Sequence, residues 1–261
     1  MSNYELKRIY LGGTGEMHLL TTGQSEYLYK PAVRKYTDIS EPFRGIVQEC
    51  GYEVQKIVDP ESAVVCRYVD CDGLRGSVQE RIKTLPNGRN YSYVQFYDED
   101  LSTSEVNQFL REFISDHLLC NFDGHGANFV VDENGIIRGV DKEQSFRYLR
   151  DPESRKPSVD YSPNWVYGTQ EPIYNMIFRR YAEGILDIDF SVIDRHMRRV
   201  EAVDNDTYRE IFRSYCDACS KAFGTDSEDM LDEIVSRKVN MRSNVEEFYD
   251  NLTNMRKAKG K

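Results

Sequence analysis

The spacing of apolar residues changes along the chain, and this change restricts the fold more than any other feature of the sequence. Residues 1–82 contain short runs of apolar and aromatic residues broken by glycine-containing turns, whereas apolar residues spaced three and four apart dominate the remainder. The first pattern is typical of β-strands and the second of amphipathic helices. The sequence therefore predicts an α+β fold with a small β-rich N-terminal lobe, 1–82, and a larger, mainly helical C-terminal lobe, 83–261.

Five β-prone runs define the N-terminal part. They are KRIYL (7–11), MHLLT (17–21), EYLYK (26–30), AVVCRYVD (63–70) and GSVQERI (76–82). The first three predict a hairpin followed by a third strand. Between the third and fourth runs, apolar residues from Glu41 to Val58 fall on one helical face, behind a candidate cap at Ser40. We therefore expect strands around one helix.

The C-terminal part is expected to begin with a long helix and a short hairpin. Ser102 and Glu105 have the spacing of a capping box, and the apolar repeat that follows extends to His117. The runs NFVVD and IIRGVD surround the turn ENG and predict two short strands. From Pro172 onward the pattern predicts four amphipathic helical segments, with breaks near EGILDID, VDNDT and FGTDSED.

The overall charge restricts the partners that the chain can bind. It has 34 basic and 44 acidic residues, a net charge of -10, which disfavours nucleic acid and anionic membrane surfaces. The sequence has neither the apolar core of a signal peptide nor a run long enough to span a bilayer. We therefore expect a cytoplasmic protein, although a dedicated secretion route for effector proteins would leave no such signal.

The six cysteines are expected to be reduced and not to form a metal site. They are scattered through apolar segments, as in proteins of a reducing compartment. Cys216 and Cys219, in CDAC, lie in a helical pattern without a second Cys or His pair at ligand spacing. We interpret them as core or surface thiols.

Four polar residues between the long helix and the hairpin form the most informative pattern. Asp123, His125 and Asn128 lie on one glycine-rich turn, and Asp141 ends the second strand. A hairpin would bring Asn128 and Asp141 together as two oxygen ligands for Mg²⁺. Asp123 could then accept the proton of a substrate hydroxyl. His125 is a further candidate catalytic residue. It could be a zinc ligand or a general base, but no partner His or Cys lies at ligand spacing, so we expect it to organise the turn by a hydrogen bond to the backbone or to a neighbouring aspartate. A calcium loop is disfavoured because alternating oxygen ligands and a closing Glu are absent.

The glycine-rich turn LGGTGEMH supplies a candidate phosphate-binding loop. Gly12, Gly13, Thr14 and Gly15 lie between the first two predicted strands, where the missing Cβ atoms would let backbone amides approach phosphate oxygens. A plain hairpin turn is the alternative for the same residues.

Lys30 is the candidate lysine for those phosphates. It ends the third predicted strand, and a charged residue in an apolar strand must be solvated or paired. Glu49 and Glu53 lie one turn apart on the helix that follows, so either could pair with it, and we prefer Glu49. A solvated lysine and a solvated acidic flank are the alternatives.

The turn at Asp123 resembles the catalytic loop of a known kinase family. Asn121, Asp123, His125 and Asn128 match the N-x-D-x-H-x-x-N motif of HipA-type kinases, and the D-x-H-x-x-N core is similar to that of phosphatidylinositol 3- and 4-kinases. YLYKP followed by EPF resembles the lysine motif of type II phosphatidylinositol 4-kinases, and GVDKEQSF resembles their metal-binding segment. The matching motifs fall within residues 9–146.

The resemblance implies an atypical, bilobal protein-kinase-like fold with ATP between the lobes. It assigns phosphate binding to Lys30, pairing with that lysine to Glu49, catalysis to Asp123, and Mg²⁺ binding to Asn128 and Asp141. The sequence lacks DFG and APE motifs, so the activation-loop logic of ordinary protein kinases does not carry over.

The resemblance also implies an adenine site. The strand GSVQERIK would lead into the hinge between the lobes, with backbone groups of Glu80, Arg81 and Ile82 facing the base.

The expected function is that of an ATP-dependent phosphotransferase that uses Mg²⁺, or Mn²⁺, and acts on a serine or threonine hydroxyl of a protein. A small-molecule or lipid kinase, a nucleotidyltransferase and a non-catalytic nucleotide-binding protein are the alternatives. The polar segment 151–172, which contains Trp165, is either a docking site for the acceptor or a surface loop. The sequence does not indicate an oligomeric state.

Overall fold

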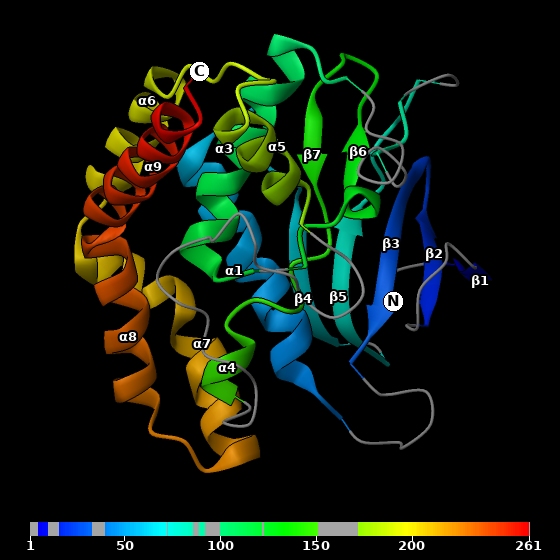
Figure 1. The fold of residues 1–261 in the computed structure, drawn as a ribbon. Helices are drawn as coiled ribbons and strands as arrows, with labels where there is room; N and C mark the ends of the chain where they lie inside the picture. The colour runs from blue at the N-terminus through cyan, green and yellow to red at the C-terminus, as the bar shows by residue number, and fades with distance from the viewer. Residues whose placement is uncertain are drawn as a thin grey trace.

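The computed structural model describes residues 5–9, 16–32, 40–71, 73–85, 89–91, 100–121, 123–150 and 172–260. These residues form an α+β fold with a small antiparallel sheet, a short separate hairpin and several helices (Figure 1). The α+β class predicted from the change in apolar spacing is confirmed.

The five-stranded sheet contains all the strands expected in the N-terminal part. Its strands are β1 (Glu5–Ile9), β2 (Met17–Thr22), β3 (Ser25–Pro31), β4 (Cys66–Cys71) and β5 (Leu74–Glu80). Their order is β1-β2-β3-β5-β4, and every neighbouring pair is antiparallel. Lys30, near the end of β3, pairs with Ser77 of β5. At the next pair, a Cβ on Gly76 would overlap the carbonyl oxygen of Lys30, so glycine permits the close approach of the two strands.

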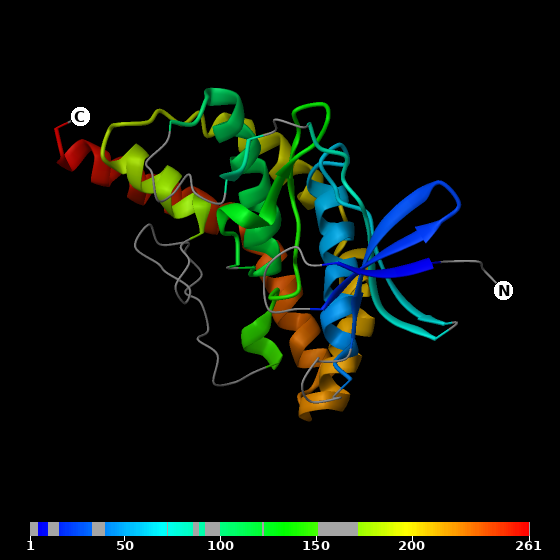
Figure 2. The same ribbon diagram turned by 90° about the vertical axis from the view of Figure 1, so that its right-hand side faces the viewer.

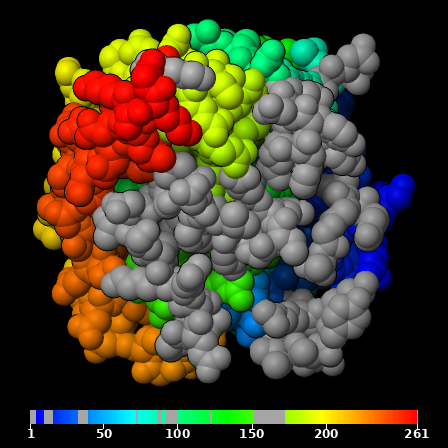
Figure 3. All heavy atoms as spheres, viewed as in Figure 1, coloured from blue at the N-terminus to red at the C-terminus, as the bar shows by residue number. Residues whose placement is uncertain are grey.

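The helices and the hairpin follow in chain order. They are α1 (Pro42–Val58), α3 (Thr103–Leu119), η2 (Gly126–Asn128), β6 (Phe129–Val131), β7 (Ile137–Gly139), α4 (Arg147–Arg150), α5 (Ile173–Ala182), α6 (Ser191–Glu201), α7 (Asn205–Phe223), α8 (Ser227–Val239) and α9 (Met241–Ala258). Helix α1 lies between the sheet and the other helices, in contact with β4, β5, α3, α6 and α7 (Figure 2). In the space-filling view, α8 and α9 form the side of the molecule opposite β1 (Figure 3).

The two predicted helix starts had different outcomes. At α3, the Ser102 side chain accepts from the Glu105 N–H and the Glu105 carboxylate accepts from the Ser102 N–H, so the capping box is confirmed. At α1, the N-cap residue is Glu41 and makes no side-chain cap, so the prediction of a Ser40 cap was wrong. Pro42 opens that helix, and its missing N–H removes one of the donors that a cap would otherwise have to satisfy.

Five helices follow Pro172 in the described chain, where four segments were expected. The additional break separates α8 from α9 at Asn240. Cys216 and Cys219 are fully buried free thiols in the main core, as the sequence indicated. Among the described residues, no helix is long and apolar enough to cross a membrane.

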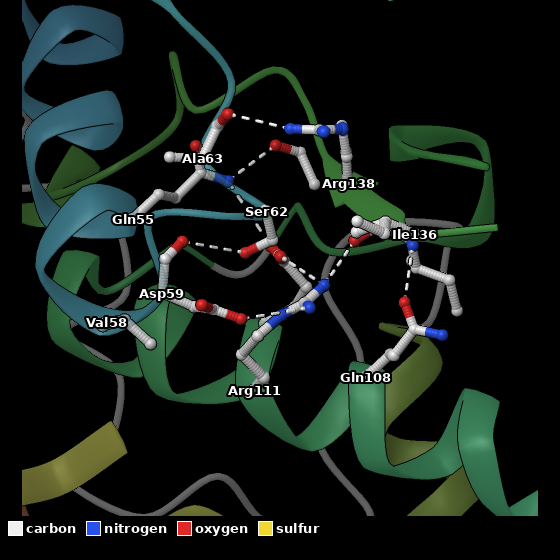
Figure 4. Close-up of polar contacts among 12 residues, drawn as sticks. Gln55, Val58, Asp59, Ser62, Ala63, Gln108, Arg111, Ile136 and Arg138 are labelled. Atoms are coloured by element: carbon white, nitrogen blue, oxygen red, sulfur yellow. Dashed lines mark hydrogen bonds and ion pairs between the residues drawn. The ribbon is translucent and has the colours of Figure 1, made fainter. Parts of the chain in front are cut away.

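A polar network fastens the connection between α1 and β4 to α3 and to the β6–β7 hairpin (Figure 4). Arg111 of α3 lies 3.3 Å from the Asp59 carboxylate, and its guanidinium also donates to the Ile137 carbonyl. Arg138 of β7 donates to the Ala63 carbonyl at 3.1 Å. Because buried charges are costly unless paired and hydrogen-bonded, this network favours one position of the hairpin relative to α1.

Candidate functional site

The turn that holds Asp123 is shaped by local backbone geometry at both ends. Cys120 is the C-cap residue of α3, and its left-handed backbone (φ 50°) turns the chain sharply. After the turn, the Asn128 side chain donates from Nδ2 to the Asp123 carbonyl at 2.7 Å, and the Asn128 carbonyl accepts from the Val140 N–H at 2.8 Å. The turn is therefore closed on itself and joined to the end of the hairpin.

Lys30 and Asp141 meet between the sheet and the hairpin. Lys30 Nζ lies 2.8 Å from Asp141 Oδ2 and 3.8 Å from Glu143 Oε2. Burial alone would lower the pKa of Lys30, but the two carboxylates outweigh it and raise that pKa above its ordinary value. Burial would likewise raise the pKa of Asp141, yet Lys30 and the Glu143 N–H hold it below its ordinary value. Both groups are therefore charged near neutral pH.

Asp123 lies in the electrostatic field of the same carboxylates. Burial raises the pKa of its carboxyl group to about 7, and the charges of Asp141 and Glu143 add to the rise. A carboxyl group with this pKa can accept and release a proton near neutrality, which is the property required of a general base. The structure thus brings together Lys30, Asp123 and Asp141, which are far apart in the sequence.

His125 is the N-cap residue of η2 and lies beside Asp123. Its Nε2 is 3.6 Å from Asp123 Oδ1, a close contact that is too long for a hydrogen bond. Burial lowers the pKa of the imidazole despite the opposing charge of Asp141. His125 therefore lies close to a neighbouring aspartate without the hydrogen bond that was expected, and its ring is predominantly neutral at pH 7.

The predicted pairing of Lys30 with Glu49 or Glu53 is not formed. Arg67 NH1 lies 3.2 Å from Glu49 Oε1 and 2.6 Å from Glu53 Oε1, and the N–H of the residue after Arg67 donates to Glu49 Oε2 at 3.0 Å. The acidic flank of α1 therefore faces β4, where a guanidinium neutralises it. Lys30 is held instead by Asp141.

Asn128 and Asp141 fit a magnesium ion by the chemistry of their free oxygens. The Asn128 amide nitrogen is used by the Asp123 carbonyl, which leaves Oδ1 as the atom that can bind a metal. Asp141 Oδ1 is buried and makes no hydrogen bond within the described residues. The described part of the chain holds no cluster of three His, Cys, Asp or Glu side chains suited to a metal. Mg²⁺ commonly takes one or two protein ligands and completes its shell with phosphate and water.

The predicted phosphate-binding turn and residues 151–171 of the predicted docking segment lie outside the described residues. Gly12, Gly13, Thr14 and Gly15 lie outside the described residues, as does Trp165.

At the other end of the predicted nucleotide site, two N–H groups of the segment expected to face adenine take part in the sheet. The N–H of Glu80 donates to the Val65 carbonyl at 2.9 Å, and the N–H of Arg81 donates to the Glu26 carbonyl at 3.4 Å. These two N–H groups complete strand pairing and are not available to adenine, whereas a contact through other backbone groups of Glu80 and Arg81 stays a prediction. The corresponding role of Ile82 stays a prediction.

Three residues beside the site were not selected from the sequence as functional. Asp116 of α3 is fully buried and pairs with Lys142, and Tyr174 of α5 donates to the same carboxylate. The available signal was an acidic residue inside the apolar repeat of α3, which must be paired if it is buried.

A separate cavity shares no residue with the site. It is lined by Asp100, Leu101, Met176, Arg180, Ile185 and Leu186.

No protein-family model matches the chain, and no curated protein matches its sequence. Because a fold by itself does not define an activity, the proposed function rests on the chemistry of the site residues.

Proposed function

We propose that this protein transfers the γ-phosphoryl group of ATP to a hydroxyl group, as a serine/threonine protein kinase of the atypical HipA-like and phosphatidylinositol-kinase-like type. The observation that carries the proposal is the 2.8 Å contact between Lys30 Nζ and Asp141 Oδ2, together with the effect of the Asp141 charge on Asp123, whose pKa is raised to about 7. Phosphoryl transfer requires a lysine on the phosphates, metal ligands and a carboxylate that orients the acceptor. The chemical types of Lys30, Asp123 and Asp141 correspond to these three requirements, which supports the proposal.

Each of these side chains has a distinct part in the proposed reaction. Lys30 would bind the phosphate oxygens, and Asn128 and Asp141 would hold Mg²⁺, with Mn²⁺ as a substitute. The bound metal would neutralise the charge that develops on the phosphate oxygens. Asp123 would accept a hydrogen bond from the acceptor hydroxyl, orient its oxygen towards the γ-phosphorus and take its proton.

The contact between Lys30 and Asp141 is compatible with this proposal. It pairs a cation suited to phosphate with an anion suited to a metal ion. Binding of ATP and Mg²⁺ would supply each group with a stronger partner and separate them.

The proposed fold is the bilobal arrangement of the same kinases, with residues 1–82 and 83–261 as the lobes and ATP between them. The position of α1 between the sheet and the other helices supports this arrangement. The contact of β3 with the end of the hairpin supports it as well, because Lys30 and Asp141 would then approach ATP from opposite lobes.

Label transfer from ATP tests the proposal. The protein is incubated with γ-labelled ATP, Mg²⁺ and dephosphorylated casein, and wild type is compared with Asp123→Ala and Asp141→Ala. Asp194→Ala is the matched control, because Asp194 is a partly exposed aspartate on α6 that pairs with Arg242. We expect transfer by wild type and by the control, and a loss of about 10²-fold or more in the other two variants.

The outcomes separate the claims. If wild type binds ATP yet neither consumes it nor transfers label to casein or to itself, the protein is not a kinase and a nucleotide-binding role replaces the proposal. Transfer that survives Asp123→Ala would remove only the role assigned to Asp123.

A further inference from the structure

A buried carboxylate on α3 contacts both functional segments of the site. Asp116 has no exposed surface, and its Oδ1 lies 2.6 Å from Lys142 Nζ, whose side chain is 5% exposed. Removing two charges from water costs several kcal/mol for each ion before their attraction is counted. A pair so fully buried must therefore be held in place by good geometry and further hydrogen bonds.

The first connection leads from Asp116 to the metal-binding segment. Lys142 directly follows Asp141, and its side chain runs through space left by two glycines. A Cβ on Gly51 of α1 would lie 2.9 Å from Lys142 Cβ, and one on Gly139 of β7 would lie 2.8 Å from Lys142 Nζ. This close packing leaves the lysine little freedom, so the backbone at Asp141 is tied to Asp116.

The second connection leads from Asp116 to the turn of Asp123. Asn121 donates from Nδ2 to Asp116 Oδ1 at 3.0 Å and from its N–H to the Asp116 carbonyl at 2.9 Å. Asn121 Oδ1 in turn accepts from the Asp123 N–H at 3.4 Å. The backbone at Asp123 is thus tied to the same carboxylate through one intervening residue.

A third contact holds the other oxygen of the carboxylate. Tyr174 of α5 donates its hydroxyl to Asp116 Oδ2 at 2.9 Å, and the N–H of Ile173 donates to the Gly124 carbonyl at 2.9 Å. A Cβ on Gly124 would lie 3.0 Å from the Tyr174 ring, so the turn rests against α5. Both carboxylate oxygens are therefore fixed in direction.

We infer that Asp116 is a positioning residue that sets Asp123 and Asp141 relative to each other, through Asn121 on one side and Lys142 on the other. The inference rests on the proposed function, because those two aspartates are its acceptor-binding and metal-binding groups. Outer partners of metal ligands change metal affinity or activity by about 10–100-fold when they are removed. The same range is expected for Asp116.

The test replaces the ion pair without leaving a buried charge unpaired. The double variant Asp116→Asn/Lys142→Met removes both charges, and Tyr174→Phe is a milder second variant that keeps both. Lys238→Met is the matched control, because Lys238 is a buried lysine of α8 that donates to the Val203 carbonyl and to Asn205. Mn²⁺ binding in the presence of ATP is measured by electron paramagnetic resonance, alongside kcat, the KM for ATP and denaturant unfolding.

We expect the double variant to bind Mn²⁺ about 10–100-fold more weakly and to lose kcat by a similar factor, with a KM for ATP within about threefold of wild type at saturating metal. Tyr174→Phe should lower kcat by about three- to tenfold. Lys238→Met should change unfolding and leave kcat and Mn²⁺ affinity unchanged, since a purely structural loss does not alter the folded site.

Two results overturn the inference, and they are distinguishable. If wild type transfers phosphate while the double variant, or Tyr174→Phe should the double variant not fold, keeps wild-type kcat and Mn²⁺ affinity, Asp116 does not position the site and the proposed function stands. If wild type neither binds Mn²⁺ with ATP nor transfers phosphate, the proposed function fails and the inference fails with it.

Discussion

Lys30 Nζ and Asp141 Oδ2 lie 2.8 Å apart and join the five-stranded sheet to the β6–β7 hairpin by an ion pair. Each side chain is partly exposed, although Asp141 Oδ1 is buried. Their charges are the two that bound Mg²⁺ and phosphate would require. In the proposed reaction, Lys30 would bind phosphate and Asp141 would bind Mg²⁺.

Replacement of Lys30 by methionine is expected to slow phosphoryl transfer by about 10²–10³-fold at saturating ATP, because a preorganised cation on the phosphates is lost. The measurement is the initial rate of label transfer from γ-labelled ATP. Lys56→Met is the control, because Lys56 is an exposed lysine on α1. A Lys30→Met variant as active as Lys56→Met would remove the lysine from the mechanism.

The raised pKa of Asp123 predicts how the stability of the metal-free protein depends on pH. In the folded protein the carboxyl group holds its proton up to about pH 7, whereas in the unfolded chain it loses the proton near 3.8. The folded state therefore binds more protons between these values, so this group makes the protein less stable as pH rises from about 4 to about 7.

An Asp123→Asn variant should not show this fall in stability, because the asparagine side chain does not titrate. Its free energy of unfolding relative to wild type should increase from pH 4 to pH 7, by an amount on the order of 2–4 kcal/mol, and then level off. Denaturant unfolding in the presence of a chelator at several pH values measures the difference. A difference that does not vary with pH would mean that Asp123 titrates normally.

Removal of the Asn128 side chain should raise the concentration of Mg²⁺ at half-maximal activity by about tenfold or more, because one protein ligand is lost and the Asp123 carbonyl loses its donor. The measurement is phosphoryl transfer as a function of Mg²⁺ at fixed ATP. Asn134→Ala, at an exposed position in the hairpin turn, should leave the Mg²⁺ dependence unchanged. Equal behaviour of the two variants would exclude Asn128 as a ligand.

Because Glu49 is paired with Arg67, the Glu49→Gln variant should behave as the loss of a surface ion pair. We expect the free energy of unfolding to fall by less than about 1 kcal/mol and the turnover rate to change by less than about threefold, with Glu53→Gln as the matched variant on the same arginine. A turnover rate lowered by about 10²-fold in Glu49→Gln alone would show that Glu49 leaves Arg67 and pairs with Lys30 during the reaction.

Features set by neighbouring residues were predictable from the sequence. The capping box of Ser102 and Glu105 depends on a spacing of three residues, and the β6–β7 hairpin depends on two short β-prone runs around a turn. The break at Asn240 was missed because no glycine or proline marks it.

Features that depend on packing between distant segments were not predictable in the same way. The apolar stripe of α1 fixes which face is buried, but not that its acidic flank meets Arg67 rather than Lys30. The pairing of Asp116 with Lys142 requires space for the lysine side chain between α1 and β7. Gly51 and Gly139 leave that space, and their proximity to Lys142 is visible only in the folded structure. An acidic residue within an apolar repeat indicates that a partner exists, and does not identify it.

The intact mass of an acceptor protein after incubation with ATP and Mg²⁺ tests the central claim most directly. The account predicts that wild type adds one or more phosphoryl groups to casein or to itself, and that Asp123→Ala adds none at the same protein concentration. A gain of AMP would show nucleotidyl transfer at this site instead. An unchanged mass with wild type, when bound ATP is detected by equilibrium dialysis, would contradict the assignment of Lys30, Asp123, Asn128 and Asp141 to phosphoryl transfer.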